Sequence, residues 1–109
     1  MVNFHHYLNY KMKEKYEVII SENFKKKFYK LSKPLQERVR KILDKLKYIL
    51  CGEALKGDLQ TFYSVHFENN KYRLIYQKED HVIRILVLHV GRRKDDFYNK
   101  LKQELGLKN

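Results

Sequence analysis

The sequence predicts an α+β domain in which two consecutive helices pack on one face of a mostly antiparallel, four-stranded sheet. Three observations predict this fold class. One β-rich run precedes two helical stripes, three β-rich runs follow them, and a short helical stripe ends the chain. Strands that cluster after helices, rather than alternating with them, indicate an α+β arrangement. With 109 residues and 43% hydrophobic content, the chain is long enough to fold around one small core.

The first half of the chain provides an N-terminal strand and a helical hairpin. Residues 16–20 are rich in β-forming side chains, and Ser21 follows as a suitable helix N-cap. The first helical stripe consists of Phe24, Phe28 and Leu31. Pro34 then begins a second helix, because proline is tolerated in the first helical turn, and Gly52 is expected to end it. The second stripe consists of Leu35, Val39, Ile42, Leu46 and Ile49.

The second half of the chain provides three strands. Residues 61–67 alternate apolar and polar side chains, and a Glu-Asn-Asn turn at 68–70 connects them to a strand at 71–77. A polar break at 78–81 predicts a hairpin, and the run at 82–90 that follows is almost continuously apolar. Such a strand is typical of the interior of a sheet, where both faces are covered.

The remaining segments are a connection at 53–60 and the two ends of the chain. Asp95 or Asp96 begins a short C-terminal helix. The apolar stripe of this helix consists of Phe97, Leu101 and Leu105. Residues 1–15 show no clear period, so we expect an N-terminal arm over 1–15 and one folded domain over 16–109.

Charge and cysteine usage narrow the class of protein. The chain has 24 basic and 13 acidic residues, a net charge of +11, which favours a polyanionic partner such as nucleic acid. Solvated helix faces rich in lysine are the alternative explanation. The single cysteine, Cys51, cannot form an internal disulfide, and no secretory segment is apparent, so we expect a cytoplasmic protein. The longest apolar run is interrupted by Arg84 and is too short to span a membrane.

The motifs of several enzyme classes are missing from the sequence. It contains no metal-ligand spacing, phosphate-binding loop, nucleophile elbow or dinucleotide fingerprint. Any chemistry would therefore come from arginine, lysine, histidine and tyrosine. These side chains suit cleavage of RNA, because arginine holds phosphate, histidine accepts a proton near neutral pH, and the 2′-hydroxyl is a built-in nucleophile. Such a reaction requires neither a metal nor a cofactor.

The strand pattern gathers several of these side chains. Alternation places Arg73 on the face opposite Tyr72 and Leu74, and the hairpin turn at 68–70 brings Ser64 and His66 beside it. Because the helical hairpin covers the aromatic face, we expect Arg73 to look out from the other face. The alternative is that Arg73 pairs with a carboxylate and His66 is an ordinary surface histidine.

Four motifs in a fixed order give a resemblance to a known family. They are Leu-Lys-Gly at 55–57, Tyr-Ser-Val-His-Phe at 63–67, Tyr-Arg-Leu-Ile-Tyr at 72–76 and Val-Gly-Arg-Arg-Lys-Asp-Asp-Phe-Tyr at 90–98. Together with the order of elements, they resemble the RelE/ParE toxin superfamily of type II toxin–antitoxin modules, over residues 16–105. The resemblance to RelE implies a toxin that cleaves mRNA in the ribosomal A site. It also implies a cognate antitoxin that wraps around the toxin in a hetero-oligomeric complex.

The resemblance also implies roles for individual residues. Arg73 matches an arginine that contacts the scissile phosphate region, and Arg93 matches one that stabilises the transition state. Tyr98 matches a tyrosine that stacks on a base or assists proton transfer. Ser64 and His66 stand where RelE-type enzymes carry lysines, one of them the general base, so His66 is the expected substitute base.

The remaining residues assigned to the site have weaker roles. Arg92, where the family often has histidine, is expected to contact phosphate or ribosomal RNA. Lys56, in a loop that is mainly structural in the family, and Lys71 are expected to bind RNA. His89 is expected to be a structural histidine of the central strand.

Two alternatives remain for the function. The ParE branch shares the fold but inhibits DNA gyrase without nuclease activity; the missing lysine base favours it, whereas Tyr98 and the C-terminal helix favour RelE. The other alternative is a non-catalytic RNA-binding module, in which neither His66 nor Tyr98 has a chemical role.

Overall fold

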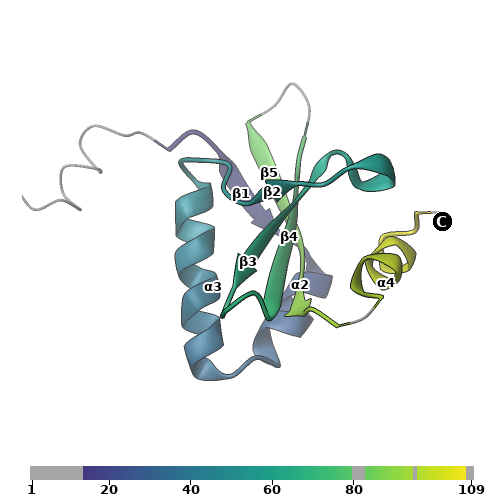
Figure 1. Cartoon of the computed structure of the whole chain (residues 1–109). Coiled ribbons are helices and arrows are strands. Elements are labelled where there is room, and N and C mark those ends of the chain that lie inside the picture. Colours follow the sequence, from purple (N-terminus) through teal and green to yellow (C-terminus); the bar gives the residue numbers. More distant parts are fainter. Residues whose placement is uncertain (1–13, 80–82, 95, 108–109) are drawn as a thin grey trace, which may run out of the picture.

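The structure, a computed structural model, describes residues 14–79, 83–94 and 96–107 (Figure 1). Most of the predicted N-terminal arm, two residues of the predicted hairpin connection, the first residue of the strand predicted at 82–90, and Asp95 lie outside the described residues. The elements in chain order are β1 (Glu17–Ile20), α2 (Glu22–Tyr29), α3 (Lys33–Leu46), β2 (Glu53–Ala54), a 3-10 turn η1 (Gly57–Leu59), β3 (Phe62–Phe67), β4 (Tyr72–Lys78), β5 (Arg84–Arg92) and α4 (Phe97–Glu104).

The strands form one mixed sheet in the order β1-β5-β4-β3-β2 (Figure 1). β1 runs parallel to β5, and the other neighbouring pairs are antiparallel. The predicted α+β fold and the interior position of β5 are confirmed, but the sheet has five strands where the sequence predicted four. The additional strand, β2, lies in the predicted connection and pairs with Tyr63 and Ser64. Two residues are too few to show the alternation by which a strand is found in a sequence.

The helical hairpin begins as its sequence predicts. Ser21 caps α2, because its Oγ accepts a hydrogen bond from the Phe24 N–H at 3.0 Å. α3 begins at Lys33 with Pro34 in its first turn. It ends at Leu46, earlier than predicted, and Ile49 lies outside the helix with 41% of its surface exposed.

The ending of α3 depends on a contact that is distant in the sequence. The Lys47 carbonyl accepts hydrogen bonds from the N–H groups of Lys15 and Tyr16, at 2.8 and 3.0 Å. The chain that enters β1 therefore satisfies the end of the helix. Gly52, predicted to end α3, lies well beyond it and has a φ of +94°. A Cβ at Gly52 would lie 2.7 Å from the Ser64 carbonyl oxygen, so the glycine permits close approach to β3.

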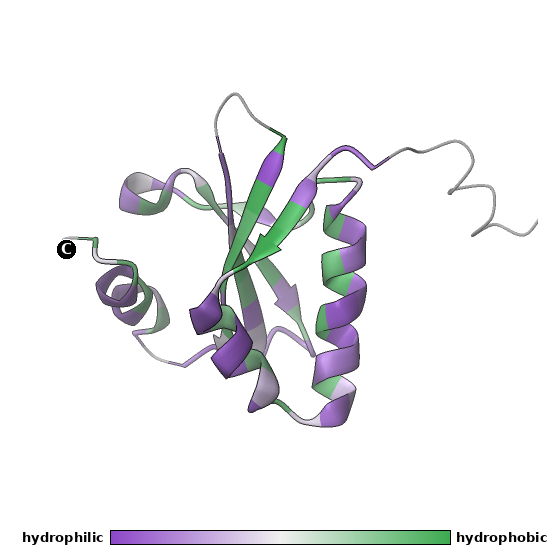
Figure 2. Cartoon of the chain, turned by 180° about the vertical axis from the view of Figure 1, so that it is seen from behind, coloured by the Kyte–Doolittle hydropathy of each residue, from purple (hydrophilic) through white to green (hydrophobic). Residues whose placement is uncertain are grey.

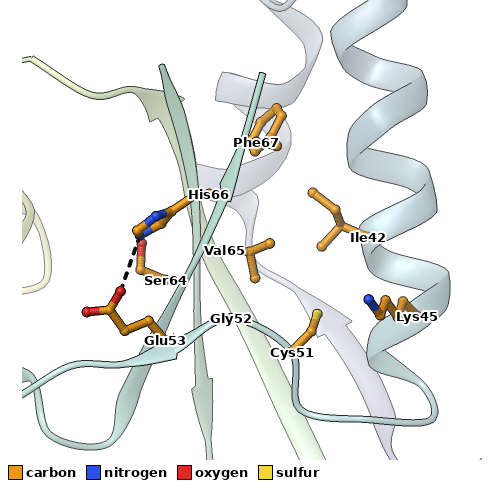
Figure 3. Close-up of a pocket in the computed structure, with 9 residues that line it drawn as sticks. All are labelled: Ile42, Lys45, Cys51, Gly52, Glu53, Ser64, Val65, His66 and Phe67. Atoms are coloured by element: carbon orange, nitrogen blue, oxygen red, sulfur yellow. Dashed lines mark ion pairs between the residues drawn. The ribbon is translucent and has the colours of Figure 1, made fainter. Parts of the chain in front are cut away.

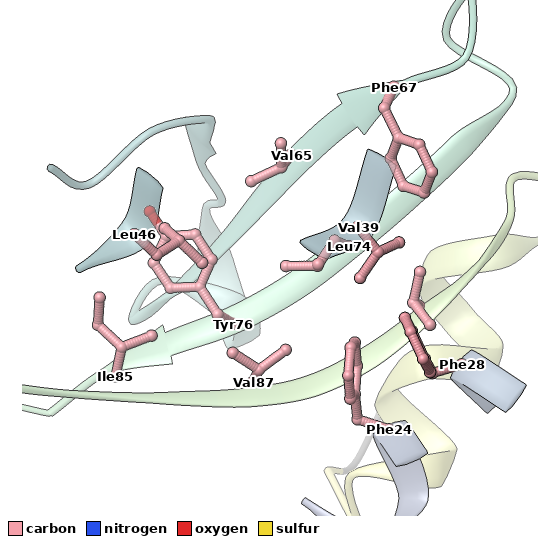
Figure 4. Close-up of a cluster of buried hydrophobic side chains, with 11 residues drawn as sticks. Phe24, Phe28, Val39, Leu46, Val65, Phe67, Leu74, Tyr76, Ile85 and Val87 are labelled. Atoms are coloured by element: carbon pink, nitrogen blue, oxygen red, sulfur yellow. The ribbon is translucent and has the colours of Figure 1, made fainter. Parts of the chain in front are cut away.

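The larger core lies between the sheet and the helical hairpin. α2 and α3 cover one face of the sheet, and Figure 2 shows hydrophilic residues on the outward side of α3. The side chains of this core are drawn in Figure 4: Phe24, Phe28, Val39, Leu46, Val65, Phe67, Leu74, Tyr76, Ile85, Val87 and Val90. We call this side of the sheet the hairpin face.

α4 packs on the opposite side of the sheet, which we call the α4 face. A smaller core lies there and consists of Leu59, Phe62, Ile75, Phe97 and Leu101. Phe62 and Ile75 belong to β3 and β4, and in each strand the next residue, Tyr63 or Tyr76, belongs to the hairpin face. Ser64 and His66 share the period of Phe62, and Arg73 shares that of Ile75, so these three polar residues lie on the α4 face.

Candidate functional site

The pairing of β3 with β4 assembles the first part of the candidate site. His66 is the direct cross-strand partner of Arg73, and Ser64 is the partner of Ile75. Residues directly opposite in an antiparallel pair have neighbouring side chains on the same face. The predicted grouping of Ser64, His66 and Arg73 on the face opposite the aromatic residues is therefore confirmed.

Arg73 differs from its prediction, because it does not look out from the sheet. Only 6% of its surface is exposed, and its Nη1 donates to the carbonyl oxygens of Asn70 and Tyr72, at 2.6 and 3.2 Å. The residues of the turn at 68–70 all have positive φ, between 52° and 67°, and the turn brings the Asn70 carbonyl to the guanidinium. The Nε atom is buried and has no hydrogen-bond partner among the described residues. Within the described ranges Arg73 forms no ion pair with a carboxylate, which was the predicted alternative.

His66 is one of the residues of β2, β3 and α3 that line a hollow, and Figure 3 shows its ring on the side of β3 away from Ile42 and Lys45 of α3. The hollow has a volume of about 460 Å³, and its lining includes Lys45, Glu53, Ser64 and His66. His66 keeps 32% of its side chain exposed, and its Nε2 lies 3.9 Å from a carboxylate oxygen of Glu53. Glu53 is itself 70% exposed, so this contact orients the ring only weakly.

Glu53 is a site residue that sequence reasoning missed. It belongs to β2, and its register opposite Ser64 brings its carboxylate toward His66. A two-residue strand leaves no periodic signal, so no pattern in the sequence could have placed Glu53 here. The one available signal is its position just after Gly52, whose missing side chain allows β2 to approach β3 closely.

Tyr98 connects α4 to the same strand. It is the second residue of α4, and its hydroxyl donates to the Ser64 Oγ at 3.3 Å. Ser64 is fully buried, and the Tyr98 ring packs edge-to-face on Phe97 with centroids 5.0 Å apart. The structure therefore brings together Tyr98 and Ser64, which are 34 positions apart in the sequence.

Arg93 lies at a second hollow, beside the N-terminal turn of α4. The hollow has a volume of about 260 Å³ and is lined by Arg93, Lys94, Asp96, Phe97, Tyr98 and Asn99. The Arg93 side chain is exposed, while its backbone N–H donates to the Lys71 carbonyl at 2.7 Å and extends the pairing of β4 with β5. Tyr98 lines this hollow and Ser64 is among the residues that line the first. Their hydrogen bond therefore connects a residue of one hollow with a residue of the other.

The other residues predicted for the site are exposed but less closely grouped. Arg92 ends β5 opposite Tyr72, and Lys71 immediately precedes β4. Lys56 precedes η1. None of these three basic residues lines either hollow. They add positive charge around the site without converging on one point.

His89 is buried, with 8% of its surface exposed, which agrees with the structural role predicted for it. Its ring packs edge-to-face on Phe97, with centroids 5.4 Å apart, and its Nδ1 lies 3.3 Å from a carboxylate oxygen of Glu104. Burial lowers the pKa of His89, and the Glu104 charge only partly offsets that effect.

Two further groups complete the chemical inventory. Burial raises the pKa of the Cys51 thiol, so it stays protonated and packs as a small apolar group. Across the described part of the chain, no three histidine, cysteine or carboxylate side chains gather closely enough to hold a metal ion. Within the same ranges, no helix is both long and apolar enough to cross a bilayer.

Comparisons with known proteins agree with this geometry. A family model described as "ParE-like toxin of type II bacterial toxin-antitoxin system" matches residues 18–102. The isolated E. coli RelE toxin is similar in structure, with a TM-score of 0.59 and 24% identity over 82% of this chain and 98% of that chain. A chain of the Mycobacterium tuberculosis RelBE2 toxin–antitoxin complex gives a TM-score of 0.64 and 23% identity, over 77% of this chain and 99% of that one.

An archaeal relative extends the similarity. A chain of the RelE-RelB complex from Pyrococcus horikoshii OT3 gives a TM-score of 0.53 and 22% identity, over 74% of this chain and 98% of that one. No curated protein sequence matches the chain significantly. At these identities the solved structures establish a shared fold, and the site must be judged from its own residues.

Proposed function

This chain belongs to the family of ParE-like toxins of type II bacterial toxin–antitoxin systems, and from this premise we propose that it cleaves mRNA at the ribosome without a metal ion. One observation carries the proposal. His66 pairs directly with Arg73 on the α4 face, and Tyr98 hydrogen-bonds to Ser64 one position along the same face. A proton acceptor, positive charge and an aromatic hydroxyl thus lie within one small region.

The proposed reaction uses the nucleophile that RNA itself supplies. The 2′-oxygen attacks the adjacent phosphorus, its proton passes to His66, and the bond from phosphorus to the 5′-oxygen breaks. The departing 5′-oxygen takes a proton from water or from the Tyr98 hydroxyl. The products are a 2′,3′-cyclic phosphate and a 5′-hydroxyl end. Arg93, exposed at the rim, stabilises the negative charge that grows on the phosphate oxygens.

His66 is suited to the role of general base by its surroundings. It is the exposed residue of β3, whereas its neighbours in the strand, Val65 and Phe67, are buried. Imidazole accepts a proton near neutral pH. The Glu53 carboxylate lies 3.9 Å from the His66 Nε2. In this proposal a histidine–carboxylate pair takes the place of the lysine base of the RelE-type enzymes.

Arg73 is assigned an indirect role. Its buried guanidinium donates hydrogen bonds to two backbone carbonyls. This arrangement favours the role of a fixed positive charge beneath His66 over the role of a direct phosphate contact. A buried cation raises the potential of the face above it, where screening by solvent is weak. The exposed arginines, Arg92 and Arg93, are then the groups that touch the phosphates.

The proposed partners follow from family membership and charge. We infer a protein antitoxin that forms a hetero-oligomeric complex with this toxin, as RelB does with RelE in the solved complexes. The ribosome and its mRNA are the proposed target, and the net charge of +11 supports binding to RNA. A ribosomal target places the protein in the cytoplasm.

The test is cleavage of mRNA on translating ribosomes, with EDTA-treated protein and mapping of the cut ends. Wild-type protein should cut in the A site, and Arg93→Ala should lower the rate about 100-fold, the usual effect of removing one contact to transition-state charge. Arg84→Ala is the matched control. It removes the same charge from the other end of β5, where Arg84 pairs with Glu17 and Glu79, and should leave the rate unchanged.

Two outcomes would contradict the proposal. Intact mRNA together with inhibited supercoiling by gyrase would assign the chain to the ParE branch. Equal rates for wild type and Arg93→Ala would remove Arg93 from the site. RNA binding with neither activity would leave a non-catalytic binding module.

A further inference from the structure

We propose that Glu104 is a positioning residue, which fixes α4 on the sheet and thereby holds Tyr98 in the site. The inference rests on the proposed function, because it assigns Tyr98 a part in the reaction. Glu104 lies at the last position of α4, at the end of the helix opposite Tyr98. Nothing in the sequence pattern singles out this exposed-looking glutamate, and its role follows from its contacts.

A single oxygen of Glu104 meets three groups from two elements. Its Oε1 accepts a hydrogen bond from the Asn23 amide, lies 3.5 Å from the Lys27 ammonium and lies 3.3 Å from the His89 Nδ1. Asn23 and Lys27 belong to α2, and His89 belongs to β5. α2 lies between α3 and α4 when the molecule is viewed from behind (Figure 2). The carboxylate therefore attaches the C-terminal end of α4 to α2 of the helical hairpin and to β5 of the sheet.

The environment keeps Glu104 ionised. Burial raises the pKa of Glu104, but the Asn23 hydrogen bond and the positive charges of His89 and Lys27 outweigh it, so the pKa ends below its ordinary value. An ionised carboxylate only accepts hydrogen bonds, so the His89 Nδ1 carries the hydrogen that points to it. With 29% of its side chain exposed, Glu104 is shielded enough for these contacts to matter.

The other contacts of α4 with the rest of the described chain are a small apolar core and a few polar contacts. It has eight residues, and a helix of that length is not stable in isolation. Phe97 and Leu101 are its buried residues. Its N-cap, Asp96, makes no side-chain capping bond and instead accepts from Asn99 within the helix. The ion pair of Lys102 with Asp58, at 3.6 Å, is more exposed on its carboxylate side.

The geometry of Tyr98 makes it sensitive to the position of the helix. Its hydroxyl lies 3.3 Å from Ser64 Oγ, near the outer limit for an O–H···O hydrogen bond. A shift of α4 by about 1 Å is enough to break it, and misplacement of that size in an active site lowers rates by up to about 100-fold. Glu104, six positions further along the same rigid helix, sets the position from which Tyr98 reaches Ser64.

The experiment measures the attachment of α4 and the rate of mRNA cleavage separately. Amide hydrogen exchange over residues 97–104 should rise about tenfold in Glu104→Ala, because charge-assisted hydrogen bonds are lost. Glu104→Gln, which retains an acceptor for Asn23 but not the charge, should give a smaller rise. Glu37→Ala is the control: it removes a carboxylate ion-paired with Arg40 on α3 and should leave α4 exchange unchanged.

The cleavage measurement tests whether Glu104 acts through Tyr98. Glu104→Ala should lower the rate of mRNA cleavage about tenfold in the wild-type background and have almost no effect in Tyr98→Phe. Equal losses in both backgrounds, or unchanged α4 exchange in Glu104→Ala, would overturn the inference. The exchange measurement needs no substrate, so it tests whether Glu104 anchors α4 even if the wild-type protein does not cleave mRNA. Intact mRNA would reject only the proposed function.

Discussion

The two faces of the sheet differ in what they contribute. Counting the described residues, the hairpin face packs against two helices and contains eleven buried hydrophobic residues, whereas the α4 face packs against one short helix and contains five. The α4 face also carries Ser64, Arg73 and His89, which are buried and polar. Free energy of folding comes mainly from burial of apolar surface, so most of it belongs to the hairpin face. The α4 face can therefore hold groups that serve chemistry at a cost to stability.

The buried arginine illustrates this division. The Nε atom of Arg73 has no hydrogen-bond partner among the described residues, and an unsatisfied buried polar atom normally costs stability. On the side of the helical hairpin the Tyr76 hydroxyl donates to the Cys51 carbonyl at 2.6 Å, and the buried Gln36 amide donates to the Phe28 and Leu31 carbonyls at 3.4 and 3.1 Å. Among the described residues, the buried side-chain atom without a hydrogen-bond partner thus lies on the α4 face.

The largest predicted effect compares one leucine from each face. Leu74 and Leu101 are both essentially fully buried, at 0% and 1% exposure. Leu74→Ala should lower the global free energy of unfolding by about 3 kcal/mol, as in other cores. Leu101→Ala should lower it by less, about 1 kcal/mol, because α4 opens locally before the sheet unfolds. Denaturant unfolding measures the first effect and amide exchange the second. If both variants lost the same free energy of unfolding, and amide exchange rose uniformly over the chain, the two faces would form one cooperative unit.

A smaller effect on stability is predicted for Arg73→Met. The substitution removes a buried charge whose Nε is unpartnered, so the free energy of unfolding should change by less than about 1 kcal/mol or increase. mRNA cleavage should nevertheless fall, because the positive charge beneath His66 is lost. The measurement is unfolding and cleavage on the same variant, with Arg84→Met as the control for loss of an exposed charge. Destabilisation comparable to that of Leu74→Ala would show that Arg73 holds the fold rather than serving the site.

The sequence predicted the structural features that depend on residues close together in the chain. The Ser21 cap, the apolar stripes of α2 and α3, and the interior position of β5 follow from propensity and periodicity. The pairing of His66 with Arg73 was also predictable, because a short turn at 68–70 fixes the register of the two strands around it.

What the sequence did not predict depends on contacts between distant segments. β2 exists because Gly52 lets the chain approach β3, and α3 ends early because Lys47 binds the backbone that enters β1. The inward orientation of Arg73 is a local exception: the nearby Asn70 and Tyr72 carbonyls accept its hydrogen bonds, which strand alternation alone does not predict. The contact between Asn23 and Glu104 joins residues 81 positions apart, and no local pattern encodes it.

The smallest predicted effect is a dependence of α4 on pH that the hairpin face does not share. His89 and Glu104 both have a pKa below the ordinary value. A lowered pKa in the folded state means that the unfolded state binds protons first, so stability falls as pH falls. Attachment of α4 should weaken as the pH drops below the ordinary His89 value of 6.5, and again below the ordinary Glu104 value of 4.5.

The measurement is the opening free energy of α4 amides, from hydrogen exchange corrected for the intrinsic effect of pH. Glu104→Gln should abolish the second weakening and leave the first. Amides of the hairpin face, such as that of Leu74, should show neither step, because the two groups with a lowered pKa, His89 and Glu104, contact each other on the α4 side of the sheet and are not members of that core. If Leu74 and the α4 amides lose protection together as the pH falls, acid acts on the whole domain, and Glu104 does not anchor α4 independently of the rest.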